Sequence, residues 1–532
     1  MNFRPFRRVP VLVLLVTALT ALVAGCAGPG AGRTVSSAGG DAREASLDAE
    51  LSVGQIGAPT SLDPHLIRNP STDLAYIFPL YDMLLQLDTE QVVAPMLATS
   101  WEVAPDGRAL TLQLRGDATF QDGSGFDSAV VKANLDRAKT LPGSTSAPLL
   151  STVTSVDTDG PQTVRISFSE PAFNFPVTLA TQPGISAMIS GQAIAEGTDI
   201  SRNPAGSGPF RLVQLGQDRL SLERNDDYWD PENMAKVKRA TVISLSDDTA
   251  RIAALQSGQI SLAPLPGHLA NTYQSLLDSG RFTKTEFAPG SVYGSYVNIS
   301  RPELNDVRVR KALSMAIDRN EMNQAVLGGA GQPAFQFYPP GTAGHVDALE
   351  QDPYDPAGAK RLLEEAGVPN LTFNMIITGS EPSQTLATIA QAQLARVGVT
   401  VNLQRVTGVE ARSTFRRGAS DGYTSGFVAT GDPSIWAADT VLGADSPGGV
   451  PPEVEKATAA ALQLQLDDPA RPAAFERMSA ALADDPVHLL FLRIPVNFVG
   501  SSQLMGVDSM TYGQWGSVIN LRSLSVAEAV AG

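Results

Sequence analysis

Cysteine is nearly absent from this sequence: Cys26 is the single cysteine in 532 residues. A disulfide requires two thiols, so the chain cannot form one internally. Histidine is also scarce, and the four present lie far apart: His65, His268, His345 and His488. Structural zinc sites draw on several cysteines or histidines at short spacings. The composition therefore excludes a disulfide framework and offers no metal-binding motif.

Motifs for catalysis and nucleotide binding are missing as well. The sequence has no HExxH, no Walker-type Gly-Lys-Ser/Thr loop and no G-x-S-x-G elbow. Two small-residue turns, QDGSGF and AGSGPF, lack the strand–turn–helix context of nucleophile or phosphate loops. Carboxylates are plentiful, but no local arrangement pairs them as in a glycosidase. We therefore expect neither an enzyme nor a cofactor.

Positive charge is in deficit, with 39 basic against 55 acidic residues and a net charge of −16. Nucleic acids and anionic lipid surfaces attract proteins with basic patches. We therefore expect no nucleic-acid partner and no electrostatic binding to a membrane.

Long hydrophobic runs are absent except at the N-terminus. There, residues 9–23 are apolar or small and follow three arginines, Arg4, Arg7 and Arg8. The run is shorter than the roughly 20 residues that span a bilayer, so a secretory signal is favoured over a retained anchor. The sequence Val23-Ala24-Gly25-Cys26 then resembles the lipobox of bacterial lipoproteins. That resemblance implies cleavage after residue 25 and lipidation of Cys26. The alternative is an incidental cysteine in an ordinary signal peptide.

A spacer follows the cysteine. Residues 27–46 are mostly Gly, Ala, Ser and charged residues, a composition that cannot bury a core and behaves as a flexible linker. One acyl chain holds a protein only marginally, whereas a lipidated cysteine with two or more chains is a stable anchor. We therefore predict a signal peptide over 1–25, a linker over 26–50, and a protein anchored by lipid on the extracytoplasmic face of the cell membrane.

Residue periodicity beyond the linker predicts alternating strands and helices, as in an α/β protein. Leu110, Leu112 and Leu114 alternate as on one face of a strand. An Asp-Gly pair at 159–160 predicts one hairpin, and residues 216–218 predict the turn of another. Residues 355–403 predict a helix capped by Asp355 and then a strand–helix–strand unit. The apolar stripes of this region indicate core rather than ligand contacts.

Residues 305–322 predict a single helix capped by Asn305 or Asp306. Its buried stripe comprises Val309, Leu313, Ala316 and Ile317. We expect Arg308, Arg310 and Arg319 on the outer, solvated face of this helix rather than around a bound phosphate.

Several segments resemble the signatures of one family, in the family's order. Residues 94–138 contain P-x-L-A-x-S-W, D-G, L-R and F-x-D-G-x-x-F, and an earlier segment, APTSLDPH, contains L-D-P. Further matches are NPAGSGPFRL, LERNDDYW, LNDVRVRKALSMAIDR and YDPAGAKRLLEEAG. Together these resemble the extracytoplasmic solute-binding proteins of family 5, the oligopeptide, dipeptide and nickel binders of ABC importers. The resemblance extends from Leu51 to about Val507.

The resemblance implies a two-lobed α/β fold of the periplasmic-binding-protein type, class II, with an extra subdomain inserted in the first lobe. We expect lobe I over 51–290, with the insertion at about 76–199, lobe II over 291–488, and a return to lobe I over 489–532. The chain is expected to cross between the lobes near 287–299 and 489–499. Ligand would be enclosed between the lobes, and the partners would be ABC permease subunits. We expect a monomer.

The family's ligand segment corresponds here to SGFVATGDPSIW, residues 425–436. Peptide-binding members pair the peptide's amino terminus with an aspartate, but Ala429 or Thr430 stands at that place. A buried ammonium without a counter-charge costs several kcal/mol. Either Asp432 or Asp421 substitutes, or the ligand has no free amine there. Asp432 has the alternative role of helix cap, and Trp436 lines the cleft or packs the lobe. The expected ligand-binding residues are Thr60, Tyr296, Phe427, Ala429, Thr430, Asp432 and Trp436.

The sequence thus predicts a transport receptor for a peptide or peptide-like solute. Direct nickel coordination is disfavoured because no histidine falls in these segments, while a chelated metal stays open. The alternative function is that of a family member that no longer carries solute and regulates cell-envelope synthesis or signalling.

Overall fold

A computed structural model of the chain describes residues 43–378, 381–428, 432–510 and 518–528. Residues 43–532 belong to one structural unit. The predicted signal peptide, Cys26 and most of the predicted linker lie outside the described residues. None of the described helices has both the length and the hydropathy of a membrane span.

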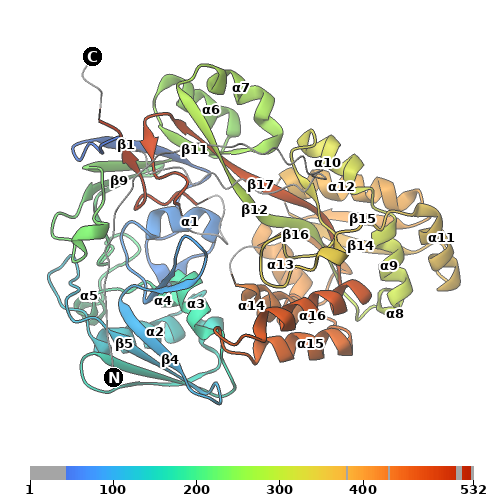
Figure 1. The fold of residues 1–532 in the computed structure, drawn as a ribbon, viewed down its shortest axis with the longest axis horizontal. Helices are drawn as coiled ribbons and strands as arrows, with labels where there is room; N and C mark the ends of the chain where they lie inside the picture. Colours follow the sequence, from blue (N-terminus) through green and yellow to red (C-terminus); the bar gives the residue numbers. More distant parts are fainter. Residues whose placement is uncertain (1–42, 379–380, 429–431, 511–517, 529–532) are drawn as a thin grey trace, which may run out of the picture. The chain divides into compact units, whose positions relative to one another are not determined.

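The described residues contain one large sheet of 11 strands (Figure 1). Its order is β15-β14-β16-β12-β17-β11-β1-β10-β9-β8, and β13 pairs with β17. The bounds are β1 Glu50–Gln55, β8 Phe210–Leu215, β9 Arg219–Arg224, β10 Arg239–Ser244, β11 Leu262–Pro266, β12 Phe282–Val297, β13 Gln332–Pro333, β14 Thr372–Ile377, β15 Thr400–Arg405, β16 Gly422–Val428 and β17 His488–Ser501.

Two long antiparallel strands, β12 and β17, connect the halves of this sheet. β12 pairs with β16 over Ser291–Val297, and β17 pairs with β11 over Val496–Gly500. The two strands also pair with each other, over Phe282–Phe287 and Ser291–Tyr296 of β12. The segments expected to cross between lobes, 287–299 and 489–499, fall mainly within these strands.

A separate four-stranded antiparallel sheet, of order β4-β5-β7-β6, has its own hydrophobic core. The bounds are β4 Ala98–Val103, β5 Ala109–Leu114, β6 Val153–Thr158 and β7 Thr163–Phe168, with helices α2 Ser128–Thr140, α3 Phe175–Thr181, α4 Pro183–Ser186 and α5 Gly191–Glu196. Leu110, Leu112 and Leu114 all face this core. The hairpin predicted at the Asp159-Gly160 turn is confirmed as β6–β7. Nearby, β2 Leu85–Leu87 pairs with β3 Val93–Pro95.

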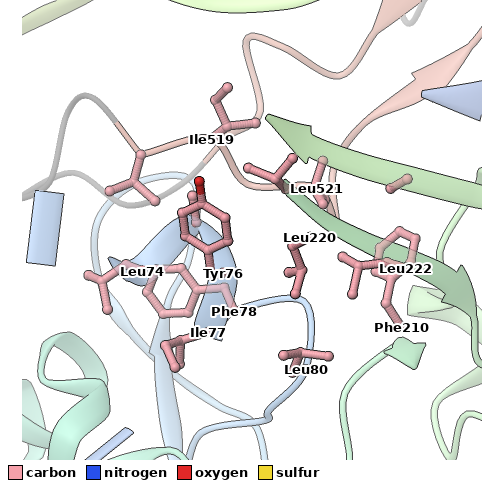
Figure 2. Close-up of a cluster of buried hydrophobic side chains, with 14 of the residues drawn as sticks. Leu74, Tyr76, Ile77, Phe78, Leu80, Phe210, Leu220, Leu222, Ile519 and Leu521 are labelled. Atoms are coloured by element: carbon pink, nitrogen blue, oxygen red, sulfur yellow. The ribbon is translucent and has the colours of Figure 1, made fainter. Parts of the chain in front are cut away.

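The C-terminal segment returns to pack against the first part of the chain. Ile519 and Leu521 lie beside Tyr76 of helix α1 (Pro70–Ile77) and Leu220 of β9 in a continuous apolar cluster (Figure 2). The short strands β18 Leu504–Met505 and β19 Ser525–Val526 pair in the same region. Helices α6 Asp248–Ser257 and α7 Ala270–Asp278 pack with β11 around another core. Burial of apolar side chains such as Ile519 and Leu521 is the main force that holds the C-terminal segment in place.

The second half of the chain forms a strand–helix–strand unit, as predicted. β14 and β15 pair in parallel, and helix α12 (Glu381–Ala395) connects them. Helix α11 (Pro356–Glu365) begins at its cap, Asp355, whose side chain accepts a hydrogen bond from the Gly358 amide. The other helices are α8 Pro302–Asn305, α9 Val307–Met315, α10 Arg319–Leu327, α13 Gly408–Arg416, α14 Pro433–Trp436, α15 Pro452–Leu462 and α16 Arg471–Asp484.

The prediction of a single helix over 305–322 with three arginines on its outer face is wrong in two respects. The chain forms two helices there, because Asp318 starts a second one by capping the Glu321 amide. Of the three arginines expected on the outer face, Arg308 is exposed, whereas Arg310 and Arg319 are buried. Their guanidinium groups bond to backbone carbonyl oxygens, which replace the water they would have at a surface.

Candidate ligand-binding site

Two of the predicted site residues, Tyr296 and Trp436, lie in one aromatic cluster. Tyr296 of β12 stacks on Tyr423 of β16, with ring centroids 5.5 Å apart. His488, at the start of β17, lies 5.3 Å from the Tyr296 ring and 5.3 Å from the Trp436 ring. Burial lowers the pKa of His488 to about 4, although the charge of Asp445 opposes the shift. The histidine is therefore a neutral bridge between the two aromatic residues near neutral pH.

Trp436 occupies the last position of α14 and is only 6% exposed. Its ring stacks on Phe337 with a centroid separation of 3.6 Å and an angle of 13° between planes. Among the described residues, its indole Nε1 has no hydrogen-bond partner. A buried N–H that stays unpaired costs free energy, so this donor is available to a ligand or a water molecule.

Both carboxylate oxygens of Asp432 make contacts within the protein. One carboxylate oxygen accepts a hydrogen bond from the Ser434 amide at 2.8 Å and so caps α14, with Pro433 at the first helical position. The Arg471 guanidinium also binds both oxygens, at 2.6 and 2.7 Å. Such a bidentate pair is strong and geometrically specific.

Asp421, the other acid considered as a counter-charge, is also engaged. It forms an ion pair with Arg301 and accepts a hydrogen bond from the Asn374 amide at 2.8 Å. Arg301 in turn donates to the Thr372 carbonyl. The carboxylate therefore ties the ends of neighbouring strands together.

A third acidic group beside the aromatic cluster was not found from the sequence. Asp445 is buried and accepts hydrogen bonds from Arg412 at 3.1 and 3.2 Å and from Arg416 at 2.7 Å. Burial alone would raise the pKa of Asp445, but hydrogen bonds and charge from the two arginines outweigh it, and the pKa is lowered. No short-range motif signals this pairing, because about 30 residues separate the partners in sequence.

Thr60 belongs to a different part of the fold, the loop after β1. Its hydroxyl donates to Asp73 Oδ2 at 2.8 Å, and its amide donates to Asp73 Oδ1 at 2.9 Å. Asp73 lies on α1 and also accepts from the amides of Arg68 and Asn69. The side chain of Thr60 is exposed at a rigidly held position.

The remaining predicted residues are only partly described. Phe427 lies in β16, where its backbone pairs with Val292 of β12. Ala429 and Thr430 lie outside the described residues. Within the part of the chain that the structure describes, no group of three or more His, Cys, Asp or Glu side chains could hold a metal ion.

Comparison with known proteins assigns the chain to a family. Residues 92–449 match the family described as bacterial extracellular solute-binding proteins, family 5 middle. The glutathione-binding protein GsiB of Salmonella paratyphi A is 31% identical over 393 residues, which cover 71% of this chain and 74% of that protein.

Solved structures share the fold. A DppA periplasmic binding protein from Helicobacter pylori in complex with the peptide STSA has a TM-score of 0.75 and 20% identity, covering 91% of this chain and 99% of that one. NikA from Brucella suis in complex with Fe(III)-EDTA has a TM-score of 0.76 and 25% identity, covering 90% and 100%. The two-lobed α/β fold is thereby confirmed. The relatives are solute-binding proteins of transport systems, not enzymes. The chain belongs to the bacterial extracellular solute-binding proteins of family 5, the extracytoplasmic binding proteins of ABC importers.

Proposed function

We propose that this protein captures a peptide or peptide-like solute and delivers it to the membrane permease of an ABC importer. Membership of family 5 supports the role, and two relatives are described as binding glutathione and the peptide STSA. We assign lobe I to 51–290 and 489–532, with an insertion at about 76–199, and lobe II to 291–488. The ligand lies between these lobes, so closure removes water from its polar groups.

The ligand presents no free ammonium group at the segment that holds Ala429 and Thr430. This proposal is supported mainly by the two acids that could replace the missing aspartate. Asp432 already neutralises Arg471, and Asp421 already neutralises Arg301. Taking Asp432 for a ligand would leave the buried Arg471 without its partner, at a cost of several kcal/mol. Taking Asp421 would break its contacts with Arg301, which keeps its pair with Glu303, and with the Asn374 amide. A blocked or amide-like end avoids that cost.

Matched peptide pairs test the proposal. The same set of short peptides would be measured with free and with acetylated amino termini, by calorimetry and by thermal shift. Saturation at 100 times the dissociation constant should stabilise the fold by about 2.7 kcal/mol. We expect acetylation to leave affinity within about threefold or to improve it. A loss of about a hundredfold or more, equivalent to roughly 2.7 kcal/mol, would show that an ammonium is recognised after all.

The same screen separates transport from regulation. If no peptide or glutathione raised the melting temperature of the folded protein, the transport role would be rejected in favour of a regulatory role in the cell envelope. Glutathione should be included because a relative is described as its binding protein.

We also propose that Cys26 carries the lipid that holds the protein at the extracytoplasmic face of the membrane. The lipobox-like sequence and the following spacer support this. The protein acts as a monomer beside the permease.

A further inference from the structure

A cavity of about 340 Å³ lies within the second half of the chain. Its volume is within the usual range for small-molecule sites, about 300–1,000 Å³. Helices α9 and α16 and the loop after β13 contribute to its walls. Most of the lining is apolar, including Met315, Phe335, Leu349, Trp436 and Leu482.

The charged groups in the lining are both cations. Lys311 of α9 and Arg319 of α10 line the cavity, and its walls contain no aspartate or glutamate among the described residues. Lys311 is exposed, whereas Arg319 is only 1% exposed. Two positive charges, one from α9 and one from α10, therefore line a mostly apolar space.

The buried guanidinium of Arg319 bonds only to neutral groups in the described part of the chain. Its Nε donates to the carbonyl oxygens of Ala334 and Leu490, at 3.1 and 2.9 Å. Its Nη atoms donate to the carbonyls of Ser314 and Ile317 and to the Ser314 hydroxyl. Burial lowers the pKa of Arg319 to about 10, partly offset by Asp352, so the group is charged at neutral pH.

An unpaired donor completes the site. Trp436 lines the same cavity, is buried, and has an indole Nε1 with no partner among the described residues. A buried cation without an anion and a buried N–H without an acceptor are both costly. A carboxylate suits such a lining, since its oxygens accept hydrogen bonds and carry the complementary charge.

We propose that this cavity is a second ligand site, which takes a small carboxylic acid with an aromatic or aliphatic body. The body packs on the Phe337–Trp436 stack, and the carboxylate lies toward Lys311 and Arg319. The site shares Trp436 with the residues expected to bind the peptide, while the other residues that line it lie outside that set.

Nuclear magnetic resonance of the tryptophan indole groups tests this directly. The probe is 3-phenylpropionate, and the matched control is 3-phenylpropanol, which has the same body without the charge. The Trp436→Phe variant assigns the resonance. We expect the Trp436 signal to shift saturably with the acid and the alcohol to bind at least about tenfold more weakly. No saturable shift with the acid, or equal affinity for acid and alcohol, would overturn the proposal.

One pair of variants and one further substitution locate the site without relying on Arg319, whose removal would endanger folding. Ala483 is exposed on α16 and lines the cavity, whereas Ala480 is exposed on the same helix and lies outside the lining. Ala483→Phe should abolish binding of the acid, while Ala480→Phe should leave it unchanged. Lys311→Gln should weaken binding by about three- to tenfold. An equal effect of the two alanine variants would show that the acid binds elsewhere.

Discussion

At the scale of single residues, buried charges in this protein have several partners each. Asp82 is fully buried and accepts hydrogen bonds from Ser207 Oγ at 2.8 Å, Tyr228 Oη at 3.0 Å and Trp229 Nε1 at 2.7 Å. It also forms an ion pair with Arg522 at 2.7 Å. Since Arg522 belongs to the C-terminal segment, this network ties the end of the chain to its beginning.

Loss of the Asp82 carboxylate should strongly destabilise the protein. In Asp82→Ala, the positive charge of Arg522 stays in the interior without its counter-ion, and such losses cost about 3–5 kcal/mol. Urea unfolding at pH 7 measures the change. The matched control is Asp136→Ala, which removes an exposed pair with Lys132 and should change stability by less than about 0.5 kcal/mol. Similar losses in the two variants would contradict the argument.

His65 should make stability depend on pH in the acidic range. It is fully buried, and burial, with a smaller contribution from Arg137 against the opposing charge of Asp63, lowers its pKa from 6.5 to about 4. As pH falls below 6.5, the unfolded chain gains a proton that the native state does not accept. Stability from this residue is therefore complete above pH 6.5 and declines toward pH 4, by about 1.4 kcal/mol per pH unit.

The test is a comparison of slopes. Unfolding free energies of the natural protein and of His65→Gln would be measured between pH 7.5 and 5. The variant has no titrating group at this position, so its stability should fall less steeply, whatever its stability at pH 7.5. Identical slopes would mean that His65 is charged in the native state as readily as in the unfolded chain.

At the scale of secondary-structure elements, local patterns predicted much of the fold. The hairpin at 159–160, the leucine alternation in β5 and the strand–helix–strand unit after α11 are all confirmed. These features depend on turn residues and on periodicity, which act over a few neighbouring positions. The helix boundary at Asp318 had a local signal too, since an aspartate there can cap a new helix.

Partners that are distant in sequence could not be predicted. Arg319 is buried because carbonyl groups of Ala334 and Leu490 surround it, and these come from other elements. In the candidate site, the resemblance suggested Asp432 and Trp436 as ligand-binding residues, which stays a prediction. Nothing in the sequence indicated that Arg471 would bind Asp432 from 39 residues away. Only the folded chain determines which charges meet.

The G-S-G segment before β8 illustrates how an element depends on close backbone contact. A Cβ atom at Gly206 would lie 2.0 Å from the carbonyl oxygen of Leu80, and one at Gly208 would lie 2.5 Å from that of Pro79. These distances are far inside van der Waals contact. The amide of Gly208 also donates to the Leu80 carbonyl at 3.0 Å, so the segment cannot move away without losing this bond.

Gly206→Ala should therefore destabilise the protein by about 1–3 kcal/mol or more, as overpacking does elsewhere. Gly125→Ala is the control, because a Cβ there would meet no atom within 4 Å. It should change the unfolding free energy by less than about 0.5 kcal/mol. If both variants were as stable as the natural protein, a small shift of the backbone would relieve the contact between residue 206 and Leu80 at little cost in free energy.

At the scale of the whole molecule, the proposed lipid anchor determines where the protein works. Cys26→Ser removes the only thiol in the sequence, so the variant should lose incorporated acyl chains and leave the membrane fraction. Fractionation of cells and labelling with a fatty-acid probe would measure both effects. Ser37→Ala, in the same spacer, should stay bound to the membrane. Full retention of the Cys26→Ser protein would contradict lipidation at this residue.

The paired strands β12 and β17 restrict how the two halves of the large sheet can move. Both strands run continuously through the connection and pair with each other over Phe282–Phe287 and again over Ser291–Tyr296 of β12. A ribbon of two strands resists stretching, because its backbone is already extended, but twists with little resistance. The pairing register shifts between Phe287 and Ser291 and again between Tyr293 and Gly294, where the ladder is locally disrupted. Torsion concentrated at these two irregularities would turn one half against the other with no change in the length of the connection.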